Sequence, residues 1–298
     1  MRLHILGVKI NYDIMKALFL FNPSSGKKSK TRKINKIMDD LRGLYDVFDF
    51  VVTKSRDDFI ARAKASCGVY DVLLFAGGDG TFNMVVNALA NEDNRPILGA
   101  FPTGTVNDLA KNFGLNKKVK KSLVVLKENN VVEFDIVQAG DQYFGYTAAI
   151  GLFANIPYDT KVKKKSIFGR LAYYFKGIRY CFSKKRIEGT IDLGDQKINF
   201  KCPFLIVLNS KYIGGFKINK HSNNHDGKVD IMFTEKGMFN GLFRFLMRKK
   251  KIKHYQASRF KIDAGKDIVW DYDGEKGNAG PMNFKVLPNH LKIFAKTR

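Results

Sequence analysis

The sequence contains few cysteines. Its three cysteines, Cys67, Cys181 and Cys202, stand far apart in 298 residues and fit no metal-binding spacing. A sparse and odd set of this kind predicts free thiols in a reducing compartment. The cysteines therefore exclude a disulfide-stapled scaffold and a cysteine-based metal site.

Long hydrophobic runs are also missing. The longest uncharged stretch, residues 142–158, contains Gly, Pro, Gln and Asn, and it is too short and too polar to span a bilayer. The apolar patch near the N-terminus is interrupted by Lys9 and Asp13 and is followed by no small-residue cleavage site. These features predict a soluble, cytoplasmic protein without a signal peptide.

Acidic residues are scarce relative to basic ones. The chain has 28 Asp and Glu against 52 Lys and Arg, which gives a formal net charge of +24. Such an excess predicts a polyanionic partner: nucleic acid, nucleotide phosphates or an anionic membrane surface. Hydrophobic residues make up 45% of the chain, which excludes a disordered protein and allows one large domain or two ordinary ones.

The first half of the sequence alternates between predicted strands and helices. Apolar runs predict strands over 16–22, 45–53, 70–76 and 96–101, and helical spacing predicts helices over 30–44, 56–66, 82–91 and 107–115. Such alternation indicates crossover units on a parallel sheet with helices on both faces, a three-layer α/β domain. Ligands of such sheets bind at the carboxyl ends of the strands.

The pattern changes from about Val132 onward. Two predicted hairpins turn at Gly140-Asp141 and at Gly194-Asp195, and a helical insertion is predicted near residues 166–182. We therefore expect an α/β domain over 1–131 and a mostly antiparallel β-sandwich domain over 132–298. The extreme C-terminus is expected to be free to pack back on the first domain.

A glycine-rich loop follows the third predicted strand. Gly77, Gly78 and Gly80 would let main-chain N–H groups approach a phosphate, and we expect Thr81 to cap the next helix. Asp79, held between glycines, is placed to face a nucleotide-bound Mg²⁺. A tight structural turn before a helix would have the same composition.

Two further loops, over 22–28 and 102–108, also follow predicted strands and precede predicted helices. Both are rich in Ser, Thr, Gly and Asn, and the first carries Lys27. None of the three loops has the spacing of a Walker A motif or of a Rossmann fingerprint. Together they predict a convergent polyphosphate site at one edge of the sheet.

The stretches "NPSSGK", "GGDGTFNMVVNAL" and "PTGTVNDLAK" together resemble the diacylglycerol kinase catalytic family, which includes bacterial soluble lipid kinases and sphingosine kinases. The resemblance continues through "FGRLAYYFKG", "DGKVDI" and "DGE", so it covers nearly the whole chain. "GGDGT" alone is shared with NAD kinases and phosphofructokinases, and the resemblance implies their fold for the first domain.

The resemblance implies a set of ATP-binding residues. Lys27, Asp79 and Asp108 would organise the phosphates and Mg²⁺. The family usually has Glu where this chain has Met84, a change that removes a carboxylate beside the nucleotide. The full implied set comprises Asn22, Pro23, Ser24, Ser25, Gly26, Lys27, Thr53, Gly77, Gly78, Asp79, Gly80, Thr81, Asn83, Thr103, Gly104, Thr105, Asn107 and Asp108.

The general base is expected in the segment "DYDGE". Phosphoryl transfer to a lipid hydroxyl needs a carboxylate within reach of that hydroxyl. Asp273 and Glu275 flank Gly274 on a predicted tight turn, and the sequence does not choose between them. An ordinary Asp-Gly hairpin turn is the alternative interpretation.

A second metal site is also implied by the resemblance. "NNHDGKVD" is similar to the family segment that holds a structural Mg²⁺, with oxygens from Asn223, Asp226 and the main-chain carbonyl of Lys228. A solvated turn is the alternative interpretation of the same residues.

Two stretches, over 160–187 and 236–262, contain no acidic residue and mix Phe, Tyr, Leu and Met with Lys and Arg. This composition favours an interfacial segment that contacts anionic lipid, although a core-facing amphipathic helix with a basic outer face would share it. We therefore predict peripheral attachment at the inner face of the membrane.

These features predict an ATP- and Mg²⁺-dependent kinase that phosphorylates a lipid hydroxyl, with diacylglycerol as the favoured acceptor. One alternative is a NAD kinase-like enzyme, which "NPSSGK" and the basic aromatic stretches disfavour. The other is a basic nucleic-acid-binding protein, which would explain the charge but not the three loops. The sequence leaves the oligomeric state open, a homodimer included.

Overall fold

The computed structural model describes residues 14–22, 34–151, 186–219, 222–235 and 252–297. In these residues the first half alternates as predicted. Its elements are β1 (Lys16–Phe21), α2 (Met38–Arg42), β2 (Val47–Val52), α3 (Arg56–Ala65), β3 (Val72–Gly77), α4 (Asp79–Leu89), β4 (Ile97–Pro102), α5 (Asp108–Asn112) and α6 (Val119–Lys127).

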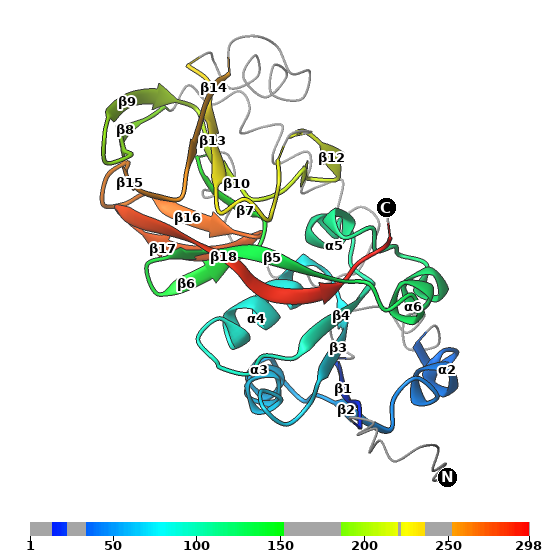
Figure 1. Ribbon diagram of the computed structural model, residues 1–298. Helices are drawn as coiled ribbons and strands as arrows, with labels where there is room; N and C mark the ends of the chain where they lie inside the picture. The colour runs from blue at the N-terminus through cyan, green and yellow to red at the C-terminus, as the bar shows by residue number, and fades with distance from the viewer. Residues whose placement is uncertain (1–13, 23–33, 152–185, 220–221, 236–251, 298) are drawn as a thin grey trace, which may run out of the picture.

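Strands β1 to β4 are parallel and lie in the order β2-β1-β3-β4. All six residues of β3 are buried, as expected for a central strand that is covered on both faces. Figure 1 shows the two covering layers, with α3 and α4 on one side of these strands and α2 and α6 on the other. This arrangement confirms the predicted α/β fold of the first half.

Helix α6 was not among the elements predicted from the sequence. Its buried residues include Val119, Leu123 and Leu126, which are spaced by four and three positions and form one apolar stripe. The signal was therefore present, but it lies within a lysine-rich segment with little overall hydrophobicity.

The rest of the chain is almost entirely β-structure in the described residues. Its strands are β5 (Val131–Ala139), β6 (Gln142–Phe144), β7 (Thr147–Ile150), β8 (Ile187–Asp192), β9 (Lys197–Cys202), β10 (Leu205–Leu208), β11 (Tyr212–Ile213), β12 (Phe216–Lys217), β13 (Val229–Phe233), β14 (Lys253–Ala257), β15 (Arg259–Asp263), β16 (Val269–Tyr272), β17 (Glu275–Ala279) and β18 (Met282–Phe294).

Both predicted hairpins form where their glycines allow a positive φ. Strands β5 and β6 pair around Gly140, with φ 62°, and β8 and β9 pair around Gly194, with φ 95°. The helical insertion predicted near 166–182 lies outside the described residues.

One long strand joins the two halves of the molecule. The second part of β18 pairs with β4 in parallel through Ile293 and Leu98, whereas both of its parts pair antiparallel with β5, with an irregularity between Leu287 and Leu291. Through β18 the parallel strands continue into β15, β8 and β9, so a ten-stranded sheet crosses the described part of the chain. The C-terminal strand thus packs back on the α/β layer (Figure 1).

A second, antiparallel sheet has the strand order β14-β13-β10-β7-β16-β17 and covers one face of the first. Trp270 is fully buried between the sheets, and its indole N–H donates to the carbonyl of Gly280 at 3.1 Å. The rings of Phe144 and Tyr272 stack beside it. This core confirms the predicted β-sandwich.

Candidate active site

The second and third predicted phosphate loops follow the carboxyl ends of the parallel strands β3 and β4. Asn22 and Thr53 follow β1 and β2, and the two strand ends are joined by the Thr53 N–H, which donates to the Phe21 carbonyl at 2.9 Å. The other predicted residues of the first loop lie outside the described residues: Pro23, Ser24, Ser25, Gly26 and Lys27.

The second and third loops touch through their glycines. A Cβ atom on Gly104 would lie 2.4 Å from the Cα of Gly78, so neither position leaves room for a side chain. The Thr103 N–H also donates to the Gly77 carbonyl at 2.8 Å. The glycines therefore serve a close approach of two backbones, which fixes the loops relative to each other.

The start of α4 differs from the prediction. The helix begins at Asp79, directly after the extended Gly78, and it has no side-chain cap. Thr81 therefore lies inside the first turn and packs on Gly77, where a Cβ would come within 2.2 Å of it. The prediction that Thr81 caps the helix is wrong, because the helix starts three residues earlier than predicted and its N-cap position is Gly78, which has no side chain to accept a helix N–H.

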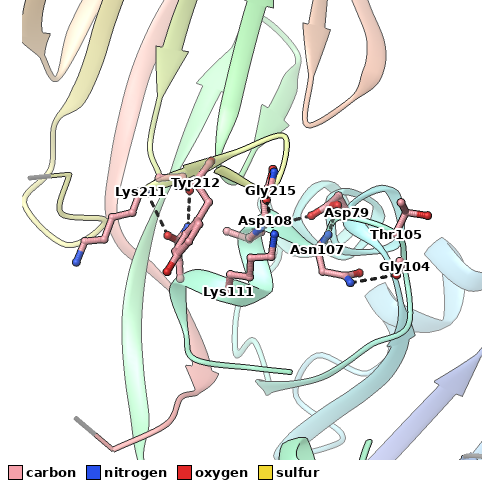
Figure 2. Close-up of polar contacts among 12 residues, drawn as sticks. Asp79, Gly104, Thr105, Asn107, Asp108, Lys111, Lys211, Tyr212 and Gly215 are labelled. Atoms are coloured by element: carbon pink, nitrogen blue, oxygen red, sulfur yellow. Dashed lines mark hydrogen bonds and ion pairs between the residues drawn. The ribbon is translucent and has the colours of Figure 1, made fainter. Parts of the chain in front are cut away.

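Asp79 points toward α5. Its carboxylate accepts the N–H of Asn107 at 2.7 Å and, more weakly, the N–H of Leu109 at 3.4 Å (Figure 2). Asn107 reaches this position with a left-handed backbone, φ 57°. Burial raises the pKa of Asp79, and the carboxylate of Asp108 raises it further.

Asp108 is 1% exposed and connects α5 with the β11–β12 hairpin. It accepts the ammonium of Lys111 at 3.1 Å and the N–H of Gly215, in the hairpin turn, at 3.0 Å. Figure 2 shows Lys111 between Asp108 and the ring of Tyr212, whose centroid is 5.8 Å away. Burial raises the pKa of Asp108, while the Lys111 partner lowers it.

The side-chain oxygen of Asn107 is a buried acceptor. Asn107 is 2% exposed; its amide N–H₂ donates to the Gly104 carbonyl at 3.2 Å, but within the described residues its Oδ1 accepts no hydrogen bond. The same Oδ1 would lie 2.4 Å from a Cβ on Gly104, so it borders the contact between the two loops. A buried acceptor without a donor is suited to a bound donor or cation.

Asp273 is a buried carboxylate with every lone-pair direction in use. It is 2% exposed and accepts the N–H groups of Gly145, Tyr146 and Thr147 at 2.8–3.0 Å and the amide of Asn83 at 3.1 Å. Burial raises the pKa of Asp273 to about 6, and this effect outweighs the four hydrogen-bond donors, which lower it. Asp273 therefore ties α4 to β7 across the junction of the two halves.

Glu275 lies two residues further on and is much more open. Its side chain is 43% exposed and lies 3.6 Å from the guanidinium of Arg56. A Cβ on Gly80 would come within 2.6 Å of a Glu275 carboxylate oxygen. The turn between β16 and β17 thus brings a solvent-accessible carboxylate against the first turn of α4.

The turn itself is held by Asp271, whose carboxylate accepts the Gly274 N–H at 2.9 Å. Asp273 adopts φ 55° and Gly274 φ 86°. Two successive left-handed residues are the geometry of an Asp-Gly hairpin turn. The segment is therefore an Asp-Gly hairpin turn, and a general base at Asp273 or Glu275 is compatible with that turn.

The segment predicted to bind a second metal is exposed at Asn223, Asp226 and Lys228. The Asp226 carboxylate accepts the Lys228 N–H at 3.1 Å. The segment is anchored by a residue that the sequence interpretation did not name: Asp135, fully buried, accepts the N–H groups of Gly227 and of Asn289 at 2.8 Å each. In the described residues no three His, Cys, Asp or Glu side chains gather as a metal site.

The chain resembles known proteins over almost its full length. The family described as "Diacylglycerol kinase catalytic domain" matches residues 16–139, and that described as "YegS C-terminal NAD kinase beta sandwich-like domain" matches residues 143–295. A diacylglycerol kinase of Staphylococcus aureus (strain MRSA252) is 30% identical over 290 residues, 94% of this chain and 92% of the relative.

The chain belongs to the diacylglycerol kinase family. A second relative, the diacylglycerol kinase of Staphylococcus saprophyticus, is 29% identical over 94% of this chain and 95% of its own. A crystal structure of a diacylglycerol kinase from Bacillus anthracis superposes with a TM-score of 0.83 at 21% identity, covering 95% of this chain and 98% of that one, and confirms the fold. Family membership makes the protein an ATP-using lipid kinase.

Several contacts of the candidate active site were not predicted from the sequence. Main-chain N–H groups of residues 145–147 hold Asp273, and no side-chain motif marks them. Arg56, paired with Glu275, comes from α3 and has no glycine-rich loop around it. Tyr146 is buried beside the site, and burial together with the carboxylates of Asp79 and Asp273 raises its pKa, so its phenol stays protonated.

None of the helices within the described ranges is both long and apolar enough to cross a lipid bilayer.

Proposed function

We propose that this kinase transfers the γ-phosphate of ATP to the free hydroxyl of diacylglycerol at a membrane surface, with Mg²⁺ as the metal. One observation carries the proposal: the Glu275 carboxylate lies against the first turn of α4, directly beside two glycine loops suited to phosphate. A base and a polyphosphate cradle are thereby adjacent. The curated relatives are named diacylglycerol kinase, which favours that acceptor.

Glu275 is the general base in this proposal. Its carboxylate is accessible, whereas both oxygens of Asp273 are occupied by four N–H donors in a buried site. The acceptor hydroxyl would give its proton to a Glu275 oxygen while its own oxygen attacks the γ-phosphorus and the bond to ADP breaks. Asp273 would act by holding the turn that presents Glu275.

The donor set at the two loops fits Mg²⁺. Asp79 and Asp108 supply carboxylates, and the unpartnered Oδ1 of Asn107 supplies a neutral oxygen, all of them hard ligands. A bound Mg²⁺ would neutralise charge on the transferring phosphate. The predicted second Mg²⁺ site at Asn223, Asp226 and the Lys228 carbonyl would be structural, steadied by Asp135 behind it.

An apolar cluster beside β16 supports a lipid acceptor. Ala149, Phe204, Ile206 and Leu208 form it on the face of the second sheet that points away from the sandwich core. In the register of the sheet, Ala149 pairs with Asp271, two residues from Asp273. The residues of this cluster are at most 8% exposed, so apolar chains would have to displace what covers them in order to bring a hydroxyl at their end toward the Glu275 turn.

Membrane contact through the basic stretches remains part of the proposal. Most of the stretch over 160–187 and residues 236–251 of the other lie outside the described residues, and the composition of both stretches supports the contact. The enzyme would act from the cytoplasmic side as a peripheral protein. A homodimer is compatible with the proposal and is not needed for it.

The experiment is transfer of labelled phosphate from ATP to a lipid panel in mixed micelles, with and without Mg²⁺. The panel contains diacylglycerol, a sphingoid base, ceramide, phosphatidylglycerol and a polyprenol. We expect diacylglycerol to be phosphorylated with the highest kcat/KM and the reaction to stop when Mg²⁺ is chelated. Preference for another lipid would overturn the proposed acceptor while leaving the kinase site intact.

A further inference from the structure

A basic hollow lies on the outer face of the ten-stranded sheet, and the kinase reaction does not use it. It has a volume of about 740 Å³. Strands β15 and β18 form its floor, and the turns of the β5–β6 and β8–β9 hairpins stand at its sides. We call it the outer hollow; its polar lining includes Arg259, Lys261, Lys285, Ser258, Asn283 and Asp192.

Strand alternation explains why cations line this face. Phe260 and Phe284 point into the sandwich core, where their rings stack with centroids 4.8 Å apart. Their neighbours Arg259, Lys261 and Lys285 must therefore point outward. The outward face of β15 and β18 therefore carries charged side chains, while the opposite face of the same strands packs in the sandwich core.

The cations are arranged at a cost to the fold. Arg259 is directly opposite Lys285 in the pairing of β15 with β18, and Lys261 is opposite Asn283 two residues further along β15, on the same face. Like charges directly opposite each other on neighbouring strands destabilise a sheet. A ligand of opposite charge would remove this penalty.

Within the described part of the chain, none of these three cations forms an ion pair. The acid of the hollow, Asp192, lies opposite Lys261 in the β8–β15 register but makes its ion pair with Lys197, at 3.6 Å. Arg259, Lys261 and Lys285 thus share one acidic neighbour, Asp192, and the lining keeps a net positive charge. The amide of Asn283 and the hydroxyl of Ser258 add hydrogen-bonding groups beside it.

The lining favours one kind of anion over others. Phe260 and Phe284 are only 4% and 1% exposed, so the hollow offers no aromatic face on which a nucleic-acid base could stack. A second copy of the chain that packed symmetrically on this face would bring its own Arg259, Lys261 and Lys285 against these cations, and the repulsion disfavours such a dimer. Figure 1 places β8, β9 and β15 at the end of the molecule away from α5 and α6, so the hollow is separate from the phosphate loops.

We propose that the outer hollow binds the phosphate of an anionic phospholipid headgroup and gives the kinase a second contact with the membrane. The choice of a lipid as the source of the phosphate rests on the proposed action at a membrane surface. The contact itself involves Arg259, Lys261 and Lys285 and needs neither ATP nor acceptor. Binding can therefore fail while catalysis persists, and the two proposals can be told apart.

The test is sedimentation of the full chain with phosphatidylcholine vesicles, with and without an anionic phospholipid, in the absence of ATP. The variant is Arg259→Gln, Lys261→Gln, Lys285→Gln. The matched control is Lys118→Gln, Lys120→Gln, Lys121→Gln, which removes three exposed lysines of the α6 region. Both variants lose the same formal charge.

At low salt we expect the hollow variant to bind anionic vesicles on the order of 10²-fold more weakly than the unmodified chain, and the control to change by about threefold or less. Thermal stability of the hollow variant should change little, because the variant removes the like-charge neighbours Arg259 and Lys285 and also the opposite-charge neighbours Lys261 and Asp192. Turnover on a short-chain, water-dispersed acceptor should be unchanged in both variants.

Equal losses in the two variants would overturn the proposal, since net charge alone would then explain binding. Glycerol phosphate and inorganic phosphate are titrated into each protein as a second arm. If they bind the unmodified chain as tightly as vesicles do, a free phosphate ester is the ligand and the lipid headgroup is wrong. Full vesicle binding by the hollow variant would likewise overturn it, and so would duplex RNA that binds the unmodified chain more tightly than vesicles do but does not bind the hollow variant.

Discussion

The two carboxylates of the β16–β17 turn have opposite surroundings. Asp273 is buried and accepts four N–H groups. Glu275 is 43% exposed, lies against the first turn of α4, and has the Arg56 guanidinium 3.6 Å away. A saturated carboxylate cannot also take a proton from a substrate without giving up its partners. In the proposed mechanism, exposure and open lone pairs, not proximity in sequence, distinguish the base Glu275 from the supporting residue Asp273.

The largest expected effect is from Glu275→Gln. Loss of the base should lower kcat by about 10³-fold, within the range of general-base catalysis, with the KM for ATP unchanged. The Arg56 pair is exposed and long, so its loss should not alter the melting temperature. Steady-state kinetics with thermal denaturation checks this. A kcat within tenfold of the unmodified enzyme would remove Glu275 as the base.

Asp273→Ala should mainly lower the stability of the fold, and any loss of turnover should follow from that. Four buried N–H donors lose their acceptor, which should lower the free energy of unfolding by about 3–5 kcal/mol. Urea denaturation followed by circular dichroism measures it. Near-normal stability together with lost turnover would reverse the roles assigned to the two carboxylates.

Gly104→Ala should disturb the phosphate loops without touching the turn. The new Cβ would lie 2.4 Å from the Cα of Gly78, so the two loops must separate. We expect the KM for ATP to rise about tenfold, while the KM for the lipid stays the same. The contrasting control is Gly274→Ala. Apart from its chain neighbours, no atom of the described residues lies within 4 Å of a Cβ added at Gly274, so the methyl group itself fits. The φ of 86° is unfavourable for alanine, however, and would strain the turn that presents Glu275. That variant should lower kcat rather than raise the KM for ATP.

The smallest expected effect is a pH dependence of stability. Burial raises the pKa of Asp273 from 3.8 to about 6, so the folded state binds its proton more tightly than the unfolded state does. Its contribution to the free energy of unfolding is therefore fully present below pH about 4 and is lost as the pH rises through about 6. Asp273→Asn should show a flatter profile between these values. Parallel profiles for the two proteins would contradict the raised pKa.

The sequence by itself determined the α/β order, both predicted hairpins and the family. Short-range patterns suffice for these, because strand and helix periodicity, turn glycines and loop motifs are all local. Thr81 shows the limit, since a helix boundary depends on where the chain actually turns. The α6 helix was missed although its apolar stripe was present.

Only the tertiary structure decided which groups meet. The joining of β18 to β4, the contact between Gly78 and Gly104, and the four donors around Asp273 bring together residues far apart in the chain. The outer hollow is of the same kind, because Arg259 and Lys285 face each other only through the pairing of β15 with β18. Main-chain donors and cross-strand neighbours leave no motif in the sequence, since they depend on backbone geometry and register rather than on residue type.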